Sequence, residues 1–224
     1  MHIGLIGGIG PAATEFYYRG LVKAHTKLGK RMELTIVHAD TREMISNLEN
    51  GCAKKQATIF EKFVDRLRAA GAGAVAVTSL GGHFCIKELE AISSLPVINA
   101  IPILDNYFGN MEIKRVGLLG TRMVMESKLY GGISSVETMG PKEGDLDVVH
   151  KNYIDIALSG VVTESQIDFF KETARKLCEE QGADVVALAG TDLFVAFEKI
   201  QSEHIVVDCA EIHIEAITEV SISS

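Results

Sequence analysis

Three polar residues that could take part in proton transfer follow the apolar run 74 to 77. Thr78 and Ser79 come directly after the run, and His83 follows four residues after Ser79. A histidine close to a hydroxyl can act as a base, orient the neighbouring side chain or close a helical turn. This loop is therefore a candidate for proton transfer on a small molecule.

A second polar set follows the apolar run 184 to 188. It consists of Gly190, Thr191 and Asp192. Asp192 could serve as a base if burial raised the pKa of its carboxyl group, and it could equally cap a helix that starts at Leu193. Both sets thus place groups that can exchange protons or donate hydrogen bonds directly after an apolar run.

A glycine-rich loop, Gly7-Gly8-Ile9-Gly10-Pro11-Ala12-Ala13-Thr14, follows the first apolar run. Free amide groups at the start of a helix attract an anion, so Gly8, Ile9 and Gly10 are candidates for binding a carboxylate or phosphate. As a dinucleotide-binding fingerprint the loop is incomplete, because Ala13 stands where the third glycine would be. A purely structural turn is the remaining interpretation.

Four further residues could contact a substrate. The guanidinium group of Arg42, which follows the run 34 to 38, is suited to pairing with a carboxylate, although a solvated surface arginine is the alternative. Thr121 could offer its hydroxyl and amide to an anion or simply cap a helix. Leu80 and Gly81 lie between Ser79 and His83, where their backbone would line the same site.

The two polar loops belong to an internal repeat. Gly4-Leu5-Ile6-Gly7 returns 113 positions later as Gly117-Leu118-Leu119-Gly120, and Ser79 has its counterpart 111 positions later in Gly190. If each copy is a strand that ends in a loop opening a helix, pseudo-twofold symmetry would bring both loops to opposite walls of one cleft. We therefore expect two facing half-sites.

Short, β-rich apolar runs alternate with amphipathic stretches. We predict strands at residues 2 to 7, 33 to 38, 74 to 79, 96 to 99, 115 to 120, 146 to 149, 184 to 189 and 204 to 208. Apolar residues recur at helical spacing in 58 to 67 and in 167 to 177, and a terminal helix is expected near 210 to 220.

This alternation predicts an α/β fold of two similar domains related by pseudo-twofold symmetry, each with a parallel four-stranded sheet flanked by helices. The first domain is expected to comprise residues 1–98 and 208–224, and the second residues 99–207. Ligands of such sheets bind at the carboxyl ends of the strands, where both polar loops fall.

Composition excludes several classes of protein. The 224 residues carry a net charge of −8 with Lys and Arg scattered, which argues against a nucleic-acid partner. No apolar stretch is long enough for a membrane span, and no basic and apolar leader precedes the first strand, so a cytoplasmic location is expected. Four cysteines lie far apart without ligand-like spacing, which predicts reduced thiols and no metal site.

Several motifs together resemble the cofactor-independent aspartate/glutamate racemase superfamily. They are the glycine loop at 7 to 14, Leu118-Leu119-Gly120-Thr121-Arg122 with Met125 and Tyr130, Gly190-Thr191-Asp192, and Ile212-His213-Ile214-Glu215-Ala216. The resemblance extends over nearly the whole chain and implies two facing α/β domains, a homodimer, no cofactor and a small amino or carboxylic acid as substrate. It also implies that two cysteines, one per domain, remove and return the α-proton from opposite faces.

The chain departs from that pattern at both thiols. The family's Cys-Asn-Thr-x-His is replaced by Ser79-Leu80-Gly81-Gly82-His83, and its Gly-Cys-Thr-Glu by Ala189-Gly190-Thr191-Asp192. A serine hydroxyl has a far higher pKa than a thiol, and glycine has no side chain, so two-thiol racemisation is not expected. Ser79, His83, Thr191 and Asp192 are the remaining catalytic candidates.

The resemblance, or the position in the sequence, suggests a role or location for three further residues. Lys151 matches a basic family residue after a short strand and could contact a second carboxylate. Cys85 is expected to pack in the core, and His213 is expected to lie outside the site. Three hypotheses follow: an enzyme acting by proton transfer at the α-carbon, an inactive family member that binds a small carboxylate, and a nucleotide-dependent oxidoreductase.

Overall fold

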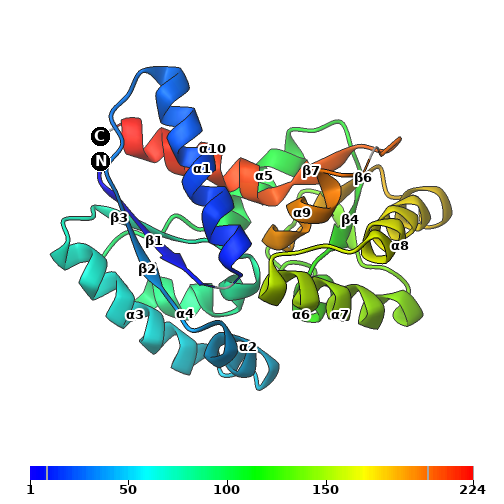
Figure 1. Cartoon of the computed structure of the whole chain (residues 1–224), viewed down its shortest axis with the longest axis horizontal. Coiled ribbons are helices and arrows are strands. Elements are labelled where there is room, and N and C mark those ends of the chain that lie inside the picture. Colours follow the sequence, from blue (N-terminus) through cyan, green and yellow to red (C-terminus); the bar gives the residue numbers. More distant parts are fainter. Residues whose placement is uncertain (9, 201, 224) are drawn as a thin grey trace. The chain divides into compact units, whose positions relative to one another are not determined.

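Two separate parallel sheets, one in each of two units, organise the chain (Figure 1). The computed structural model describes residues 1–8, 10–200 and 202–223. Unit 1 comprises Met1–Ala100 and Glu211–Ser224, and unit 2 comprises Ile101–Ala210. The predicted α/β fold with parallel sheets flanked by helices is therefore confirmed.

The sheet of unit 1 has the strand order β2-β1-β3. Its strands are β1 (Ile3–Gly7), β2 (Leu34–His38) and β3 (Ala74–Val77). Ile6 in the central strand pairs with Val37 on one side and with Val77 on the other. The carboxyl ends of β1 and β3 therefore lie side by side, where the glycine loop and the Thr78–Ser79 loop begin.

The predicted fourth strand of this unit, at residues 96 to 99, is wrong. Val97 forms only an isolated parallel bridge with Val75. Pro96 has no amide hydrogen to donate, and helix α5 (Ala100–Gly109) begins soon afterwards, so no ladder can extend from the bridge.

Helices cover both faces of the unit 1 sheet. They are α1 (Pro11–Leu28), α2 (Thr41–Glu49), α3 (Ala53–Ala69), the 3₁₀ helix η1 (Gly81–Cys85), α4 (Ile86–Ile92) and α10 (Cys209–Ile222). In Figure 1, α3 and α4 lie on one side of the strands, with α1 and the C-terminal helix α10 on the other. The C-terminal helix α10 thus covers a sheet whose strands all come from the first half of the chain (Figure 1).

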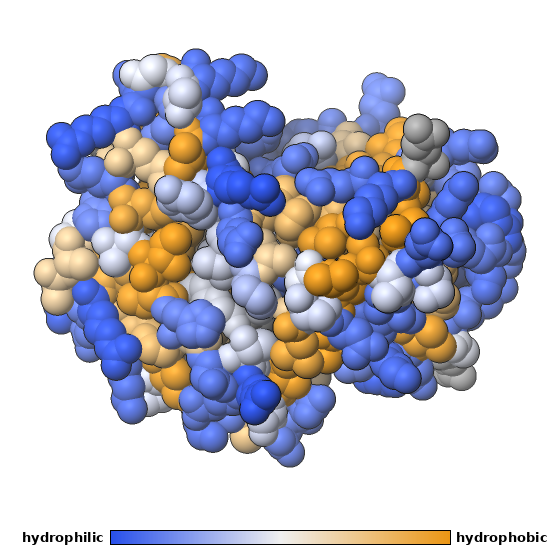
Figure 2. Space-filling view, viewed as in Figure 1, coloured by the Kyte–Doolittle hydropathy of each residue, from blue (hydrophilic) through white to orange (hydrophobic). Residues whose placement is uncertain are grey.

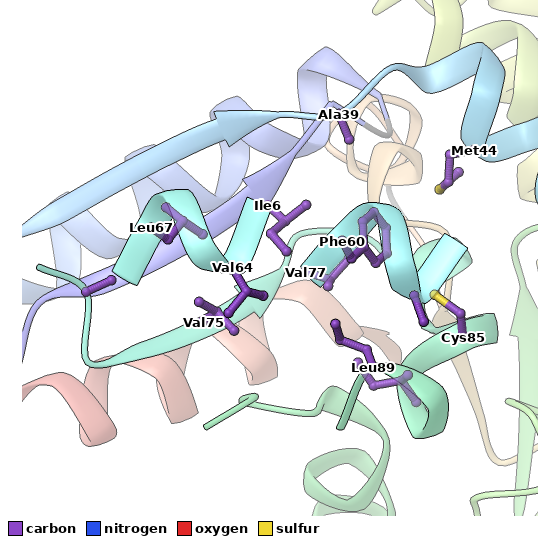
Figure 3. Packing of buried hydrophobic residues seen from close by; sticks show 13 residues of the cluster. Ile6, Ala39, Met44, Phe60, Val64, Leu67, Val75, Val77, Cys85 and Leu89 are labelled. Atoms are coloured by element: carbon purple, nitrogen blue, oxygen red, sulfur yellow. The ribbon is translucent and has the colours of Figure 1, made fainter. Parts of the chain in front are cut away.

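Alternation along the strands builds the core of unit 1. Ile6, Val75 and Val77 point to the face covered by α3, where they pack with Phe60 and Val64 (Figure 3). Each of these side chains is fully buried. Burying such a side chain contributes about 1.5–3 kcal/mol, so this layer holds the strand ends in place.

The sheet of unit 2 has the strand order β5-β4-β6-β7. Its strands are β4 (Arg115–Leu119), β5 (Glu137–Met139), β6 (Val185–Leu188) and β7 (Val206–Asp208). Its helices are α5, α6 (Arg122–Glu126), α7 (Glu143–Ser159), α8 (Glu164–Arg175), the π-helical turn η2 (Lys176–Glu180), the 3₁₀ helix η3 (Thr191–Leu193) and α9 (Phe194–Phe197).

The predicted strand at 146 to 149 is wrong, because these residues lie in α7. Leu146, Val149, Tyr153 and Ile156 are buried. Residues at this spacing of three or four lie on one face of a helix. The strand prediction rested on the short apolar run 146 to 149 and did not take this longer spacing into account. The edge strand of this sheet is instead β5.

The internal repeat is also a structural one. A Cβ atom added at Gly4 of β1 would lie 2.9 Å from Cδ1 of Leu67, and one added at Gly117 of β4 would lie 3.2 Å from Cβ of Leu177. In both units, the first strand of the repeat therefore lets a leucine from a covering helix approach its backbone closely.

The surface mixes hydrophilic and hydrophobic residues, as the face in Figure 2 shows. Within the described part of the chain, no helix combines the length and apolar character that crossing a membrane requires.

Candidate functional site

The glycine loop after β1 is held by hydrogen bonds within unit 1. The amide of Gly8 donates to Oγ1 of Thr14 at 3.0 Å, and its carbonyl oxygen accepts from the hydroxyl of Thr41. Gly8 has a φ of 102°, and a Cβ atom there would collide with the carbonyl oxygen of Ala39. Close packing against the end of β2 thus explains this glycine, while anion binding by Gly8 and Gly10 stays a prediction. The candidate Ile9 lies outside the described residues.

The loop after β3 contains two buried hydroxyls with different environments. Thr78 donates its amide and its hydroxyl to the carbonyl oxygen of Ile6, at 3.1 and 3.3 Å. Ser79 is 0% exposed, and its hydroxyl has no hydrogen-bond partner among the residues described. Leaving a buried polar group unsatisfied costs about 1–3 kcal/mol, so the Ser79 hydroxyl is the group in this loop that a ligand would satisfy.

His83 holds this loop through both of its ring nitrogens. Nδ1 lies 2.7 Å from the carbonyl oxygen of Ser79, and Nε2 accepts from the amide of Ala100 at 3.3 Å. A carbonyl oxygen only accepts, so Nδ1 carries the proton. Burial lowers the pKa of His83 to about 4, which keeps the ring neutral. Of the three roles left open for His83, this geometry favours orientation of the loop.

His213 in α10 extends this arrangement. Its Nε2 donates to the carbonyl oxygen of Ile98 at 2.8 Å, and its Nδ1 accepts from the hydroxyl of Tyr17 at 2.9 Å. Burial and the neighbouring His83 ring, 5.9 Å away between centroids, lower the pKa of His213 to about 3. Tyr17 and His213 therefore support this loop through hydrogen bonds, whereas the sequence predicted His213 outside the site and gave no role to Tyr17.

The corresponding loop of unit 2 also contains a buried hydroxyl without a partner. Thr191 is 1% exposed, and its Oγ1 has no hydrogen-bond partner among the described residues. Asp192 is fully buried within η3, and Leu193 stands at the N-cap of α9. The alternative in which Asp192 caps a helix starting at Leu193 therefore does not match the observed helix start.

Asp192 has a partner that sequence reasoning missed. The hydroxyl of Tyr153, from α7, donates to Oδ2 of Asp192 at 3.3 Å. The Tyr153 ring also lies directly against Gly190. The signal that could have revealed Tyr153 is the helical spacing of the buried residues in α7, which the wrong strand prediction obscured.

The other predicted contact residues differ in their surroundings. Thr121 caps α6 by accepting from the amide of Val124 at 3.2 Å, so capping accounts for this residue. Arg42, in the first turn of α2, is exposed, and Lys151 is exposed on α7 rather than following a strand. Leu80 and Gly81 are buried at the start of η1. Their contacts with a substrate stay predictions.

Two of the four cysteines, Cys85 and Cys209, are buried, and Cys85 ends the same 3₁₀ helix η1 that contains His83. Cys85 packs in the core of unit 1 (Figure 3), and burial raises the pKa of its thiol to about 12. Burial also raises the pKa of Cys209 well above the usual range. Both thiols are protonated at neutral pH and cannot act as bases there. Across the described part of the chain, no three His, Cys, Asp or Glu side chains gather as metal ligands would.

Comparison with solved structures places the whole chain in one fold. It is 24% identical to a candidate Asp/Glu racemase from Yersinia pestis, with a TM-score of 0.84 and coverage of 99% of this chain and 100% of the other. It is 21% identical to an aspartate racemase homologue from Pyrococcus horikoshii, with a TM-score of 0.79 and coverage of 98% of each chain. The aspartate racemase of Picrophilus torridus is 19% identical, with a TM-score of 0.80 and coverage of 99% and 94%.

The family model that matches the sequence confirms the resemblance. Residues 6–217 match the model of the Asp/Glu/Hydantoin racemase family, which is nearly the whole chain. This protein is therefore a member of the Asp/Glu/Hydantoin racemase family.

Proposed function

We propose that this chain is an enzyme that binds a small amino or carboxylic acid and transfers a proton at its α-carbon without a cofactor. Family membership supports chemistry of the racemase kind. The observation that carries the proposal is the pair of buried hydroxyls without described partners, Ser79 in unit 1 and Thr191 in unit 2. Thr191 follows Gly190, the counterpart of Ser79 in the repeat, so each half of the chain has one such hydroxyl shortly after a strand that pairs with the first strand of the repeat.

Hydroxyl donors suit the carboxylate of the proposed substrate. A carboxylate oxygen would accept from Ser79 or Thr191 and remove the cost of the unsatisfied hydroxyl. When the α-proton leaves, negative charge moves onto the carboxylate oxygens and forms an enediolate, and hydrogen bonds to these oxygens strengthen. Either hydroxyl could therefore both bind a substrate carboxylate and stabilise its deprotonated form.

The proton acceptor in this proposal is not a thiol. Ser79 and Gly190 occupy the positions where the sequence resemblance expects cysteines, and the buried Cys85 keeps its proton because its pKa is about 12. His83 uses both ring nitrogens on backbone groups. Among the four catalytic candidates, Asp192 is the side chain whose chemistry suits a base.

The test is hydrogen–deuterium exchange at the α-carbon. The purified protein is incubated in heavy water with L- and D-aspartate, L- and D-glutamate and a 5-substituted hydantoin, and NMR follows the α-proton signal. Loss of that signal above the protein-free rate supports the enzyme. Calorimetry with the same compounds measures binding independently of turnover.

A second candidate is a protein that binds a small carboxylate without turnover. The protonated, buried thiols favour it, because the two-thiol chemistry implied by the resemblance is then absent. Calorimetric binding without deuterium uptake would support this function over the first. With neither binding nor exchange, both fail for these compounds. A homodimer and a cytoplasmic location belong to the same proposal, and sedimentation of the purified protein tests the dimer.

A further inference from the structure

Position 190 has no room for a side chain. A Cβ atom added at Gly190 would lie 2.5 Å from Cε2 and 2.8 Å from Cδ2 of Tyr153, and 3.1 Å from Cα of Gly120. Real Cβ atoms do not approach other atoms this closely. Gly190 is therefore enclosed between the tyrosine ring on one side and the backbone that follows β4 on the other.

Tyr153 makes two contacts with the same loop. Its ring fills the space beside Gly190, and its hydroxyl donates to Oδ2 of Asp192 at 3.3 Å. Tyr153 is 2% exposed and Asp192 is 0% exposed, so this hydrogen bond is shielded from water. A buried tyrosine whose aromatic ring is held by packing has its hydroxyl in a fixed position, and such a hydroxyl is well suited to orient a carboxylate.

Helix α7 fixes Tyr153 in this place. Val149 and Ile156, one turn before and one turn after it, are both fully buried. Since residues at this spacing share one face of a helix, the tyrosine ring is directed inward with them. Movement of the ring away from Gly190 would require the buried face of α7 to shift.

We propose that Tyr153 is a positioning residue with two roles. Its ring fills the space that a side chain at position 190 would occupy, and its hydroxyl orients Asp192, which acts as the single base of unit 2. The inference rests on the proposed function and assigns its proton-transfer group. Asp192 accepts the α-proton, and the electron pair of the broken C–H bond moves to the substrate carboxylate to form the enediolate. Protonated Asp192, which is buried in the ligand-free protein, exchanges its proton with solvent during local opening and returns one to the same face of the α-carbon.

A single base has a stereochemical consequence. Proton return to the face it left from retains configuration, whereas racemisation requires a donor on the opposite face. The expected substrate is thus a small amino or carboxylic acid of one configuration, which incorporates deuterium in heavy water faster than it inverts. Equal exchange of both enantiomers with inversion at the same rate would overturn the inference.

Two substitutions separate the hydroxyl of Tyr153 from its ring. Tyr153→Phe keeps the ring beside Gly190 and removes the hydroxyl that donates to Asp192. With aspartate and glutamate as probes, we expect an exchange rate lower by roughly tenfold, because the base loses its fixed orientation, with the calorimetric affinity within about twofold of the unsubstituted protein. Asp192→Asn should abolish exchange. Tyr107→Phe, at an exposed tyrosine of α5, is the matched control and should leave exchange unchanged.

The ring is tested by a double-mutant cycle on the melting temperature. Gly190→Ala should lower it markedly while Tyr153 is present and by much less in the Tyr153→Ala background, because the main clash is with the ring. An equal cost in both backgrounds would overturn the steric part, and exchange that survives Asp192→Asn would overturn the assignment of the base. If the unsubstituted protein neither binds nor exchanges any probe, the proposed function fails together with the proton-transfer step.

Discussion

His83 donates its Nδ1 hydrogen to the carbonyl oxygen of Ser79 at 2.7 Å, so the histidine fixes the backbone of the residue whose own hydroxyl has no described partner. A series of buried side chains continues from this contact through the backbone at Ile98 and Ala100 to His213 and Tyr17. Three distant segments of unit 1 thereby determine the conformation of one loop. Fixed surroundings with an unsatisfied group are typical of a binding site rather than of a well-packed core.

Substitution of Ser79 by alanine should separate stability from ligand binding. Ser79→Ala removes a buried unsatisfied hydroxyl, so the free energy of unfolding should rise by about 1 kcal/mol, while aspartate or glutamate should bind more weakly by about the same amount. Denaturant unfolding and calorimetry measure the two effects. The neighbouring Thr78→Val is the matched control: it loses a satisfied hydrogen bond to Ile6 and should destabilise the protein instead. A Ser79→Ala protein that is less stable would contradict this assignment.

Thr191 offers the same test in unit 2. Thr191→Val preserves shape and removes the hydroxyl, so binding of the same ligand should weaken by about 1 kcal/mol, the contribution of one hydrogen bond. Titration calorimetry measures the change. An affinity unaffected by Thr191→Val would remove Thr191 from the site.

The buried histidines should make stability depend on pH. His83 and His213 have folded-state pKa values of about 4 and about 3, below the ordinary value of 6.5. Below pH 6.5 the unfolded chain binds protons that the folded chain does not, so stability falls with decreasing pH, by about 1.4 kcal/mol per unit for each histidine. Above pH 6.5 both states are neutral at these residues, and the contribution is constant.

From pH 7.5 to 5.5 these two groups together should lower the free energy of unfolding by about 3 kcal/mol. Urea unfolding at a series of pH values measures the slope. In His83→Gln one of the two titrating groups is gone, and the slope over this range should be roughly halved. Stability that is constant from pH 7.5 to 5.5 would mean that these rings titrate normally in the folded protein.

Removal of the Tyr17 hydroxyl should weaken the support behind the Ser79 loop. Tyr17→Phe leaves Nδ1 of the buried His213 without its donor, which should reduce the free energy of unfolding by about 1 kcal/mol or more. Tyr18→Phe, at the neighbouring exposed tyrosine of α1, should have little effect. Equal unfolding free energies for the two variants would show that the Tyr17–His213 contact contributes nothing measurable.

Thiol reactivity should follow burial. In the native protein at pH 8, iodoacetamide should modify the partly exposed Cys52 and Cys178 much faster than the buried Cys85 and Cys209. Peptide mass spectrometry after timed labelling identifies the modified residues, and labelling in denaturant provides the reference for full reactivity. Deuterium exchange at the substrate should survive native-state alkylation. Its loss after selective alkylation would place a thiol in the chemistry.

The sequence by itself determined the buried strands and the loops that follow them. Runs such as 74 to 77 and 184 to 188 are apolar on both faces, and a strand covered by helices on each side is the structure that buries such a run. The repeat of Gly4 and Gly117 is visible in the sequence, whereas the leucines that approach them, Leu67 and Leu177, are identified only by the packing of the covering helices. Family membership rests on the order of such local motifs along the chain.

Tertiary structure alone decided how the candidate side chains are used. Tyr17 contacts His213 across 196 positions, and Tyr153 contacts Asp192 across 39. No local pattern specifies either partner, because both contacts arise only when separate helices pack against one sheet. Residues 146 to 149 became a helix for the same reason: their apolar side chains gain burial on a helical face shared with Tyr153. Hydrophobic alternation fixes what forms locally, whereas packing decides which polar groups meet and which hydroxyls are left for a ligand.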